Sequence, residues 1–298
     1  MSTPAITADQ VAAVPVAPRQ RRGMVLLRTT LRQWRGRIGL AIFVFMVLVA
    51  LVGPLLAPHS PDAFVTAPNG PGTSQALFGG DALGRDVWSR FLHGGTSVLG
   101  MSVGATAIGV GLGLVIGLTA AYIGGITDEV LMRISDVFMA FPQIVLALLL
   151  VTAFGPSVPL IILIVGISTS PRVARVIRGA ALQVVERDFV KAAEAVGEPR
   201  RRIIFGELLP NVTSPLLVEV GLRLTYSIGL IAALNFIGDG IQPPAADWGV
   251  MINENRLSVS VQPWGVLLPI IAIALLTIGT NLLTDAFARA AIGLNRGE

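Results

Sequence analysis

Few side chains in the sequence have the types and spacing that catalysis requires. His59 and His93 do not form an HExxH pair, and no carboxylate cluster has metal-ligand spacing. Lys191 is the only lysine and is not part of a Gly-Lys-Ser/Thr motif, so the chain has no P-loop to hold ATP phosphates. Cysteine is absent, which excludes disulfides and thiolate ligands. We therefore expect no catalytic residue, no metal site, no cofactor and no enzyme activity from this chain alone.

One pair of charged side chains lies inside an apolar stretch. Glu219 and Arg223 are four residues apart, so they share one face of the helix expected over 215–237. Charged groups inside a membrane are costly and mark functional sites by default. Two interpretations remain open, namely a structural pair that neutralises itself and a contact that lines a gate or pore.

The 188–211 segment is a polar island, DFVKAAEAVGEPRRRIIFGELLPN, between two apolar stretches. Helix formers run over 185–196, and Gly197 follows where a left-handed residue is expected to end a helix. Pro199 suits the first turn of a second helix, because the missing N–H would have no partner there. Pro210 is expected to end that second helix.

Two interpretations of the 188–211 segment remain. In one, it is an ordinary loop whose arginines only hold the topology. In the other, the two helices present a face of small residues that fits a groove on a soluble partner. That face would consist of Ala192, Ala193 and Gly197.

The composition indicates an all-α polytopic membrane protein. Hydrophobic residues make up 53% of the chain and charged residues 13%, against roughly 25% charged residues in a soluble domain. A helix needs about 20 apolar residues to cross the hydrocarbon layer. Six transmembrane helices are predicted, over 38–57, 98–123, 137–153, 157–170, 215–237 and 264–283. The fourth is short and must take in residues from the flank at 172–178.

The positive residues are unevenly distributed among the loops. Four segments, 1–37, 124–136, 171–210 and 289–298, hold 18 of the 22 Lys and Arg residues. The positive-inside rule places these segments, both termini included, in the cytoplasm. The net charge of +4 is therefore a topology signal, and we expect no nucleic-acid partner. Residues 1–20 lack periodicity and are predicted to be a disordered tail.

A row of glycines in the second span predicts close packing of helices. Small residues about one turn apart let two helix backbones approach in lipid. The row consists of Gly100, Gly104, Gly109, Gly113 and Gly117. Its partner is a helix of this chain or of a second subunit.

The stretch 78–92 is predicted to form a short interfacial helix that acts as an external scaffold. Asp81 and Arg85 are four residues apart. An apolar face would be shared by Val87, Trp88, Phe91 and Leu92.

The 188–211 segment resembles the EAA loop of ABC-importer permeases. The resemblance rests on an alanine pair, a glycine four residues later and a Leu-Pro-Asn sequence, namely Ala192, Ala193, Gly197, Leu209, Pro210 and Asn211. Lys191 stands where the family usually has a glutamate, and Glu207 stands where a histidine is common.

Two further stretches resemble one subgroup of that family, the C-type permeases of dipeptide, oligopeptide and nickel importers. LGRDVWSR at 83–90 is similar to the stretch before the second span in that subgroup, and IGDGIQPPAADWG at 237–249 is similar to the stretch after the fifth. With the 188–211 segment, the likeness covers 32–283.

The resemblance implies a type I ABC importer permease fold. Its parts would be a cytoplasmic N-terminal tail, a first transmembrane helix with an external loop, a permease core and a cytoplasmic C-terminal tail, over 1–37, 38–96, 97–285 and 286–298. The 188–211 segment would be the coupling helix that docks on the ATP-binding subunit. The docking residues would be Ala192, Ala193, Gly197, Glu198, Pro199, Arg200, Leu209 and Pro210.

The resemblance also implies partners and a place in the cell. A homologous permease subunit, two ATP-binding subunits and an extracytoplasmic solute-binding protein would assemble with this chain, surrounded by membrane lipid in a bacterial or archaeal inner membrane. Peptides are the expected solute, because the spans lack the imidazole and carboxylate sets that a metal prefers. A permease for nickel or another small solute is the alternative, followed by a secondary transporter driven by an ion gradient.

Overall fold

The computed structural model of the chain describes residues 28–295, and the predicted tail at 1–20 lies outside them. Five of its helices are long and apolar enough to cross a membrane. They are α2 (Trp34–Leu56), α3 (Val87–Ile123), α6 (Val158–Val185), α10 (Thr213–Ile237) and α12 (Trp264–Asn295). Five of the six predicted spans are thus confirmed, and α6 includes the arginine-containing flank as expected.

The third predicted span differs from the expectation. The chain forms two helices there, α4 (Gly125–Ala140) and α5 (Gln143–Phe154), with an 84° bend between them. Pro142 explains the bend, because proline lacks the N–H for an intrahelical bond and favours an extended residue before it; Phe141 is extended. A single unbroken helix over 137–153 is therefore wrong, and a sixth span is present only if the bent pair of α4 and α5 crosses as one broken span. Residues 125–136 are helical where a loop was expected.

The stretch 78–92 does not form a separate helix. Val87 begins α3 directly, and the Asp86 carboxylate caps it by accepting hydrogen bonds from the amides of Trp88 and Ser89 at 3.3 and 3.1 Å. The residues before Asp86 form a loop, because Gly79 and Gly84 adopt left-handed φ angles of 78° and 89°. The second span therefore starts earlier than predicted.

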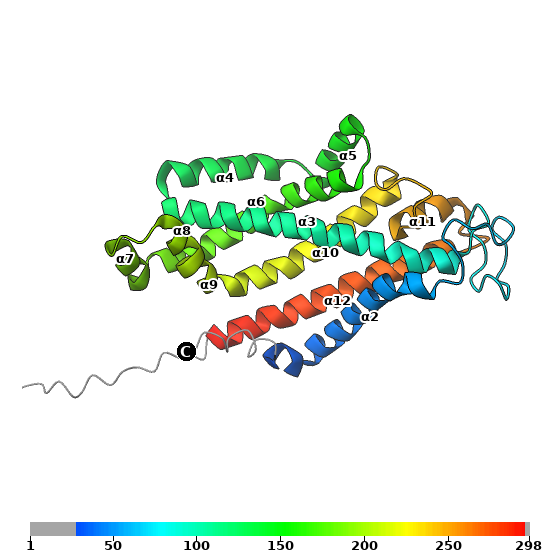
Figure 1. Cartoon of the computed structure of the whole chain (residues 1–298), viewed down its shortest axis with the longest axis horizontal. Helices are drawn as coiled ribbons and strands as arrows, with labels where there is room; N and C mark the ends of the chain where they lie inside the picture. Colours follow the sequence, from blue (N-terminus) through cyan, green and yellow to red (C-terminus); the bar gives the residue numbers. More distant parts are fainter. Residues whose placement is uncertain (1–27, 296–298) are drawn as a thin grey trace, which may run out of the picture.

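The last helix is also longer than predicted. The sequence predicts a span that stops at residue 283 and a tail over 286–298, whereas α12 continues to Asn295. Pro269 lies inside this helix, near its start, and does not end it. Figure 1 shows the end of α12 beside the start of α2, at the same end of the molecule as α7 (Asp188–Ala195). The loop over 57–86 and α11 (Trp248–Asn255) lie at the opposite end.

Part of the glycine row packs α3 directly against α6 of the same chain. A Cβ atom added at any of three glycines would lie 2.6 to 2.9 Å from a backbone carbonyl oxygen of α6, at Gly109, Gly113 and Gly117. Such distances leave no room for a side chain, so the backbones are in contact. The predicted seam is confirmed there, whereas Gly100 faces open space and Gly104 meets only the side chain of Ile162.

The seam gives a matched pair of substitutions. Gly113→Leu forces a side chain against the Ser170 carbonyl, and we expect it to lower the free energy of unfolding by about 1–3 kcal/mol or more. Gly111→Leu is the control, because nothing lies within 4 Å of its added Cβ. Thermal unfolding of the two purified variants in detergent measures the difference. Equal melting temperatures would contradict the seam.

Candidate functional site

The 188–211 segment folds as the sequence predicts around Gly197. Helix α7 ends in a Schellman motif, in which the Glu198 amide donates to the Ala193 carbonyl at 3.1 Å and the Gly197 amide to the Glu194 carbonyl at 3.0 Å. Gly197 has φ +83°, which a residue without Cβ adopts at little cost. The helix therefore ends at this glycine, as predicted.

The second half of the segment is one continuous helical stretch with a widened turn. It comprises α8 (Arg200–Arg202), the π-helical η2 (Ile203–Leu208) and α9 (Leu209–Asn211). Pro199 immediately precedes it as the N-cap rather than inside the first turn. Pro210 does not end it, since the helix reaches Asn211. The widened turn accommodates this proline, because its missing N–H leaves no ordinary bond to the preceding turn.

The segment is attached to the ends of α3 and α6 by a buried apolar cluster. From the segment and the residue after it come Val190, Ile203, Ile204, Leu208 and Val212, which pack with Leu118 of α3 and with Ile177 and Ala181 of α6. Tyr122 at the end of α3 packs against the same cluster. Because both helices hold the segment, it is a rigid protrusion rather than a loose loop.

The outer face of the segment is hollowed. A cavity of about 300 Å³ is lined by Ala192, Ala193, Val196, Glu198, Arg202, Ile203 and Glu207. Ala192 is exposed, and the Val196 side chain is 83% exposed at the rim. Arg202 pairs with Glu198 at 3.2 Å beside it. A shallow apolar hollow edged by charges suits a protruding side chain of another protein.

The structure brings together only some of the predicted docking residues. Ala193 is partly buried and contacts the apolar cluster, so the exposed small-residue face is narrower than predicted. Gly197, Pro199 and Arg200 are exposed next to the cavity without lining it. Leu209 and Pro210 lie at the far end of the segment, near the start of α10, and do not reach the cavity.

Glu219 and Arg223 form the expected ion pair inside α10. Their Oε2 and Nε atoms are 3.0 Å apart, and the side chains are only 6% and 7% exposed. The Arg223 guanidinium also lies 5.1 Å from the centroid of the Tyr226 ring. One turn further on the same face, Ser227 accepts a hydrogen bond from Thr106 of α3. This face points into the helix bundle, which favours the structural interpretation over a pore contact.

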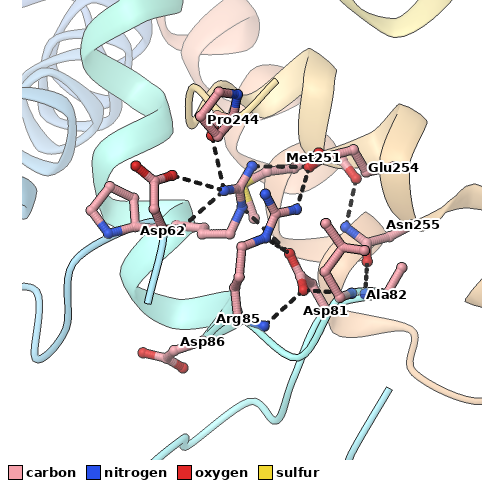
Figure 2. Close-up of polar contacts among 12 residues, drawn as sticks. Asp62, Asp81, Ala82, Arg85, Asp86, Pro244, Met251, Glu254 and Asn255 are labelled. Carbon is pink, nitrogen blue, oxygen red and sulfur yellow. Dashed lines mark hydrogen bonds and ion pairs between the residues drawn. The ribbon is translucent and has the colours of Figure 1, made fainter. Parts of the chain in front are cut away.

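A second polar cluster, at the opposite end, went unrecognised in the sequence apart from one pair. Figure 2 shows Arg85 between Asp81 and Glu254, at 2.7 and 2.8 Å. Arg90 is fully buried and donates to the same Glu254 carboxylate at 2.9 Å. The pair of Asp81 and Arg85 was identified, but on a helix rather than in this turn. Glu254 lies in α11, far along the chain, and no local spacing signals it.

Helix α11 and Asp247, the residue that caps its start, lie at the same end of the molecule. Asp247 accepts hydrogen bonds from the amides of Gly249 and Val250 and from the Ser97 hydroxyl. Burial raises the pKa of the Asp247 carboxyl, and these hydrogen bonds partly offset the rise. Trp248 is fully buried against α3 and donates its indole N–H to the Phe91 carbonyl at 2.9 Å. The loop over 57–86, α3 and α11 therefore form one platform.

Comparisons with known families agree over most of the chain. The family model described as binding-protein-dependent transport system inner membrane component matches residues 109–292. The model described as the N-terminal TM domain of oligopeptide transport permease C matches residues 26–71. Together they include the first span, the glycine seam and the 188–211 segment.

Individual proteins similar to this chain are named as transport system permeases. The chain is 36% identical over 260 residues to a putative peptide transport system permease protein of Brucella suis, which covers 87% of each chain. It is 35% identical to a dipeptide transport system permease protein of Alkalihalophilus pseudofirmus, with 85% of this chain and 84% of the relative covered. A glutathione transport system permease protein of Escherichia coli is 35% identical over 84% of each chain.

One solved structure supports the fold. It shows inward-facing conformations of the MetNI methionine ABC transporter. The TM-score is 0.51 at 19% sequence identity, and the match covers 66% of this chain and 96% of the other. At that identity the likeness concerns the helix arrangement alone.

The left-handed turn gives a prediction for the stability of the 188–211 segment. Gly197→Ala should destabilise it by about 1–2 kcal/mol, because an L residue with a Cβ resists φ +83°. Gly206→Ala is the control, since this glycine is helical and its added Cβ approaches only Arg202, at 3.9 Å. Hydrogen exchange of the segment should rise in the first variant only. Faster exchange in both would show that any side chain disturbs the segment.

The buried ion pair gives a second prediction. Glu219→Gln or Arg223→Met alone leaves one unpaired buried charge. Each substitution should lower the free energy of unfolding by about 3–5 kcal/mol. The double variant removes both charges with similar volumes and should unfold close to the original. Thermal unfolding in detergent measures this double-mutant cycle. If the single variants unfold like the original chain, the pair has no structural role and the pore interpretation gains.

Proposed function

The chain belongs to the family of binding-protein-dependent transport system inner membrane components, and on that premise we propose that it forms half of the pore of an ATP-driven peptide importer. The peptide solute is supported by the relatives, whose names specify peptides, a dipeptide or glutathione. The observation that carries the proposal is the rigid, hollowed 188–211 segment on the ends of two spans.

In this proposal the 188–211 segment is the coupling element that docks on an ATP-binding subunit. Ala192, Ala193 and Glu198 line the hollow that receives the partner. Gly197, Pro199 and Arg200 form the exposed turn beside it. Leu209 and Pro210 connect the element to α10, so their role is to transmit movement rather than to contact the partner. ATP hydrolysis takes place on the partner, because this chain has no P-loop.

The proposed orientation follows the charge distribution. The basic start of α2 and the end of α12 lie at the same end as α7 in Figure 1, and we assign that end to the cytoplasm. Both termini are then cytoplasmic, in the inner membrane of a bacterial or archaeal cell. The domain organisation is a tail over 1–37, a first helix and external loop over 38–96, a core over 97–285 and a terminal segment over 286–298.

The remaining partners are assigned to different faces. A homologous permease subunit completes the pore, and the exposed apolar side chains of α4, α5 and α10 supply its contact surface. Among them are Val137 at 62%, Leu149 at 61% and Tyr226 at 55% exposure. The platform of the external loop and α11 faces the solute-binding protein. A second ATP-binding subunit docks on the homologous permease.

The mechanism follows from how the coupling element is held. Closure of the ATP-binding subunits draws the two coupling elements together. Because the element is packed on both α3 and α6, it moves these helices with it. Each nucleotide state then stabilises one helix arrangement more than the other and switches the pore between inward-open and outward-open. The two helices move as one body, since their backbones touch at the glycine seam.

Cysteine cross-linking tests the docking face, since the chain contains no cysteine of its own. Val196→Cys places one thiol at the rim of the hollow, where the side chain is 83% exposed. With a maleimide that carries a benzophenone, whose photoactivated carbonyl inserts into a nearby C–H bond, we expect this variant to be joined to a co-expressed ATP-binding subunit. The measurement is the mass of the product on a denaturing gel.

The control is Leu257→Cys, because Leu257 is 86% exposed and follows α11 at the opposite end. It should give no product with the ATP-binding subunit. A product from Leu257→Cys, or none from Val196→Cys in an intact complex, would refute the proposed docking face.

A further inference from the structure

The adjoining ends of α2 and α12 form a basic cavity that the proposed function does not use. Its volume is about 520 Å³, and it is lined by Arg32, Gln33, Trp34, Arg35, Arg37 and Arg289. Three arginines come from the start of α2 and the residues before it, and Arg289 comes from α12. No carboxylate lines it among the residues that the structure describes.

The walls of this cavity are fixed by close packing of the two helices. A Cβ added at Gly36 would lie 2.2 Å from the Thr30 carbonyl oxygen and 3.2 Å from the Ala286 Cβ. One added at Gly39 would lie 2.6 Å from the backbone nitrogen of Leu283. The Gln33 side chain donates a hydrogen bond to the Ala286 carbonyl at 3.4 Å. The arginines are thus mounted on two helix ends whose separation is set by the backbone.

The positive charge in this cavity is uncompensated within the described residues. The ion pairs of the described part of the chain involve other arginines and do not include Arg32, Arg35, Arg37 or Arg289. The Arg35 guanidinium lies over the ring of Trp34, at 5.7 Å from its centroid. Several guanidinium groups facing one space favour an anion with several oxygens, and phosphate fits their paired N–H groups.

The position of the cavity identifies the source of that phosphate. It lies where the apolar span of α2 begins, and Trp34 is 63% exposed there, as is common for tryptophan at the headgroup level. Below it, α2 exposes apolar side chains along its length, including Ile38 at 43%, Phe45 at 58% and Leu48 at 52%. An acyl chain covers such a surface, whereas a free phosphate ion does not.

We propose that this cavity binds the phosphate headgroup of an anionic phospholipid, with an acyl chain lying along α2. The guanidinium groups of Arg32, Arg35, Arg37 and Arg289 hold the phosphate oxygens. The lipid therefore joins the first span to the last at one membrane surface. This site is separate from the coupling element, so its test is independent of the transport function.

Native mass spectrometry of the full-length chain tests the proposal. The purified, delipidated chain is given dioleoylphosphatidylglycerol or dioleoylphosphatidylcholine, and bound lipid is counted. We expect phosphatidylglycerol to bind at least about ten-fold more tightly. Arg35→Gln/Arg289→Gln should weaken it about 25-fold, since each basic residue near a membrane surface contributes about 1 kcal/mol, or roughly five-fold. Arg289→Gln alone should weaken it about five-fold.

The control variant is Arg256→Gln, which removes one exposed arginine from the opposite end of the molecule. It should bind phosphatidylglycerol like the original chain. Equal binding by the double variant and the original chain would overturn the proposal, as would equal binding of the two lipids. A third arm adds millimolar sodium phosphate. Full displacement of the lipid by phosphate would show a soluble-anion site and would also overturn it.

Discussion

The contact of α3 with α6 is the constraint on which both polar ends of the molecule depend. Lipid gives no hydrophobic drive for two helices to associate, so their pairing rests on close packing. The glycine seam allows that packing over two helical turns, with carbonyl oxygens of α6 where side chains would otherwise stand. Because α6 leads directly into the 188–211 segment, the seam also fixes where that segment stands relative to α3. A looser seam would leave the segment held by a single helix.

Helix α3 connects this contact to the opposite end of the molecule. It begins at the Asp86 cap, beside the buried Arg90, and ends near Tyr122, which packs against the same apolar cluster as the 188–211 segment. Buried charges offset their desolvation only when they are closely paired, and Glu254 pairs with two arginines at once at the start of α3. This one helix of 37 residues is therefore anchored by polar contacts at its start and by the apolar cluster at its end. A tilt of α3 at one end therefore also displaces the residues at its other end.

The features that could be predicted from the sequence are those that depend on residues close together in the chain. Apolar length gave five spans, and the helix end at Gly197 was predicted because only a few residue types suit a left-handed turn. The bend at Pro142 was missed, because hydropathy measures apolarity and not direction. Glu254 was missed because its arginines are more than 160 residues away, and local spacing carries no record of such a contact. The extent of the hollow was predictable only in part, since Ala193 contacts an apolar cluster that includes residues of α3, more than 70 residues away along the chain.

The arginines at the two ends of the molecule differ in burial and in pairing, and the difference bears on the function of each end. At the end formed by the loop over 57–86 and α11, Arg85 and Arg90 are buried and matched to carboxylates of the same chain, so their charge stabilises the platform and is hidden from other molecules. At the other end the arginines at the start of α2 and in α8 are exposed, and most of them have no partner within the described residues. An exposed, uncompensated charge contributes little to folding, because water already solvates it. Such charges are useful when something outside the chain supplies the counter-charge, which is the role that we propose for a partner protein at the 188–211 segment and for a lipid headgroup at α2.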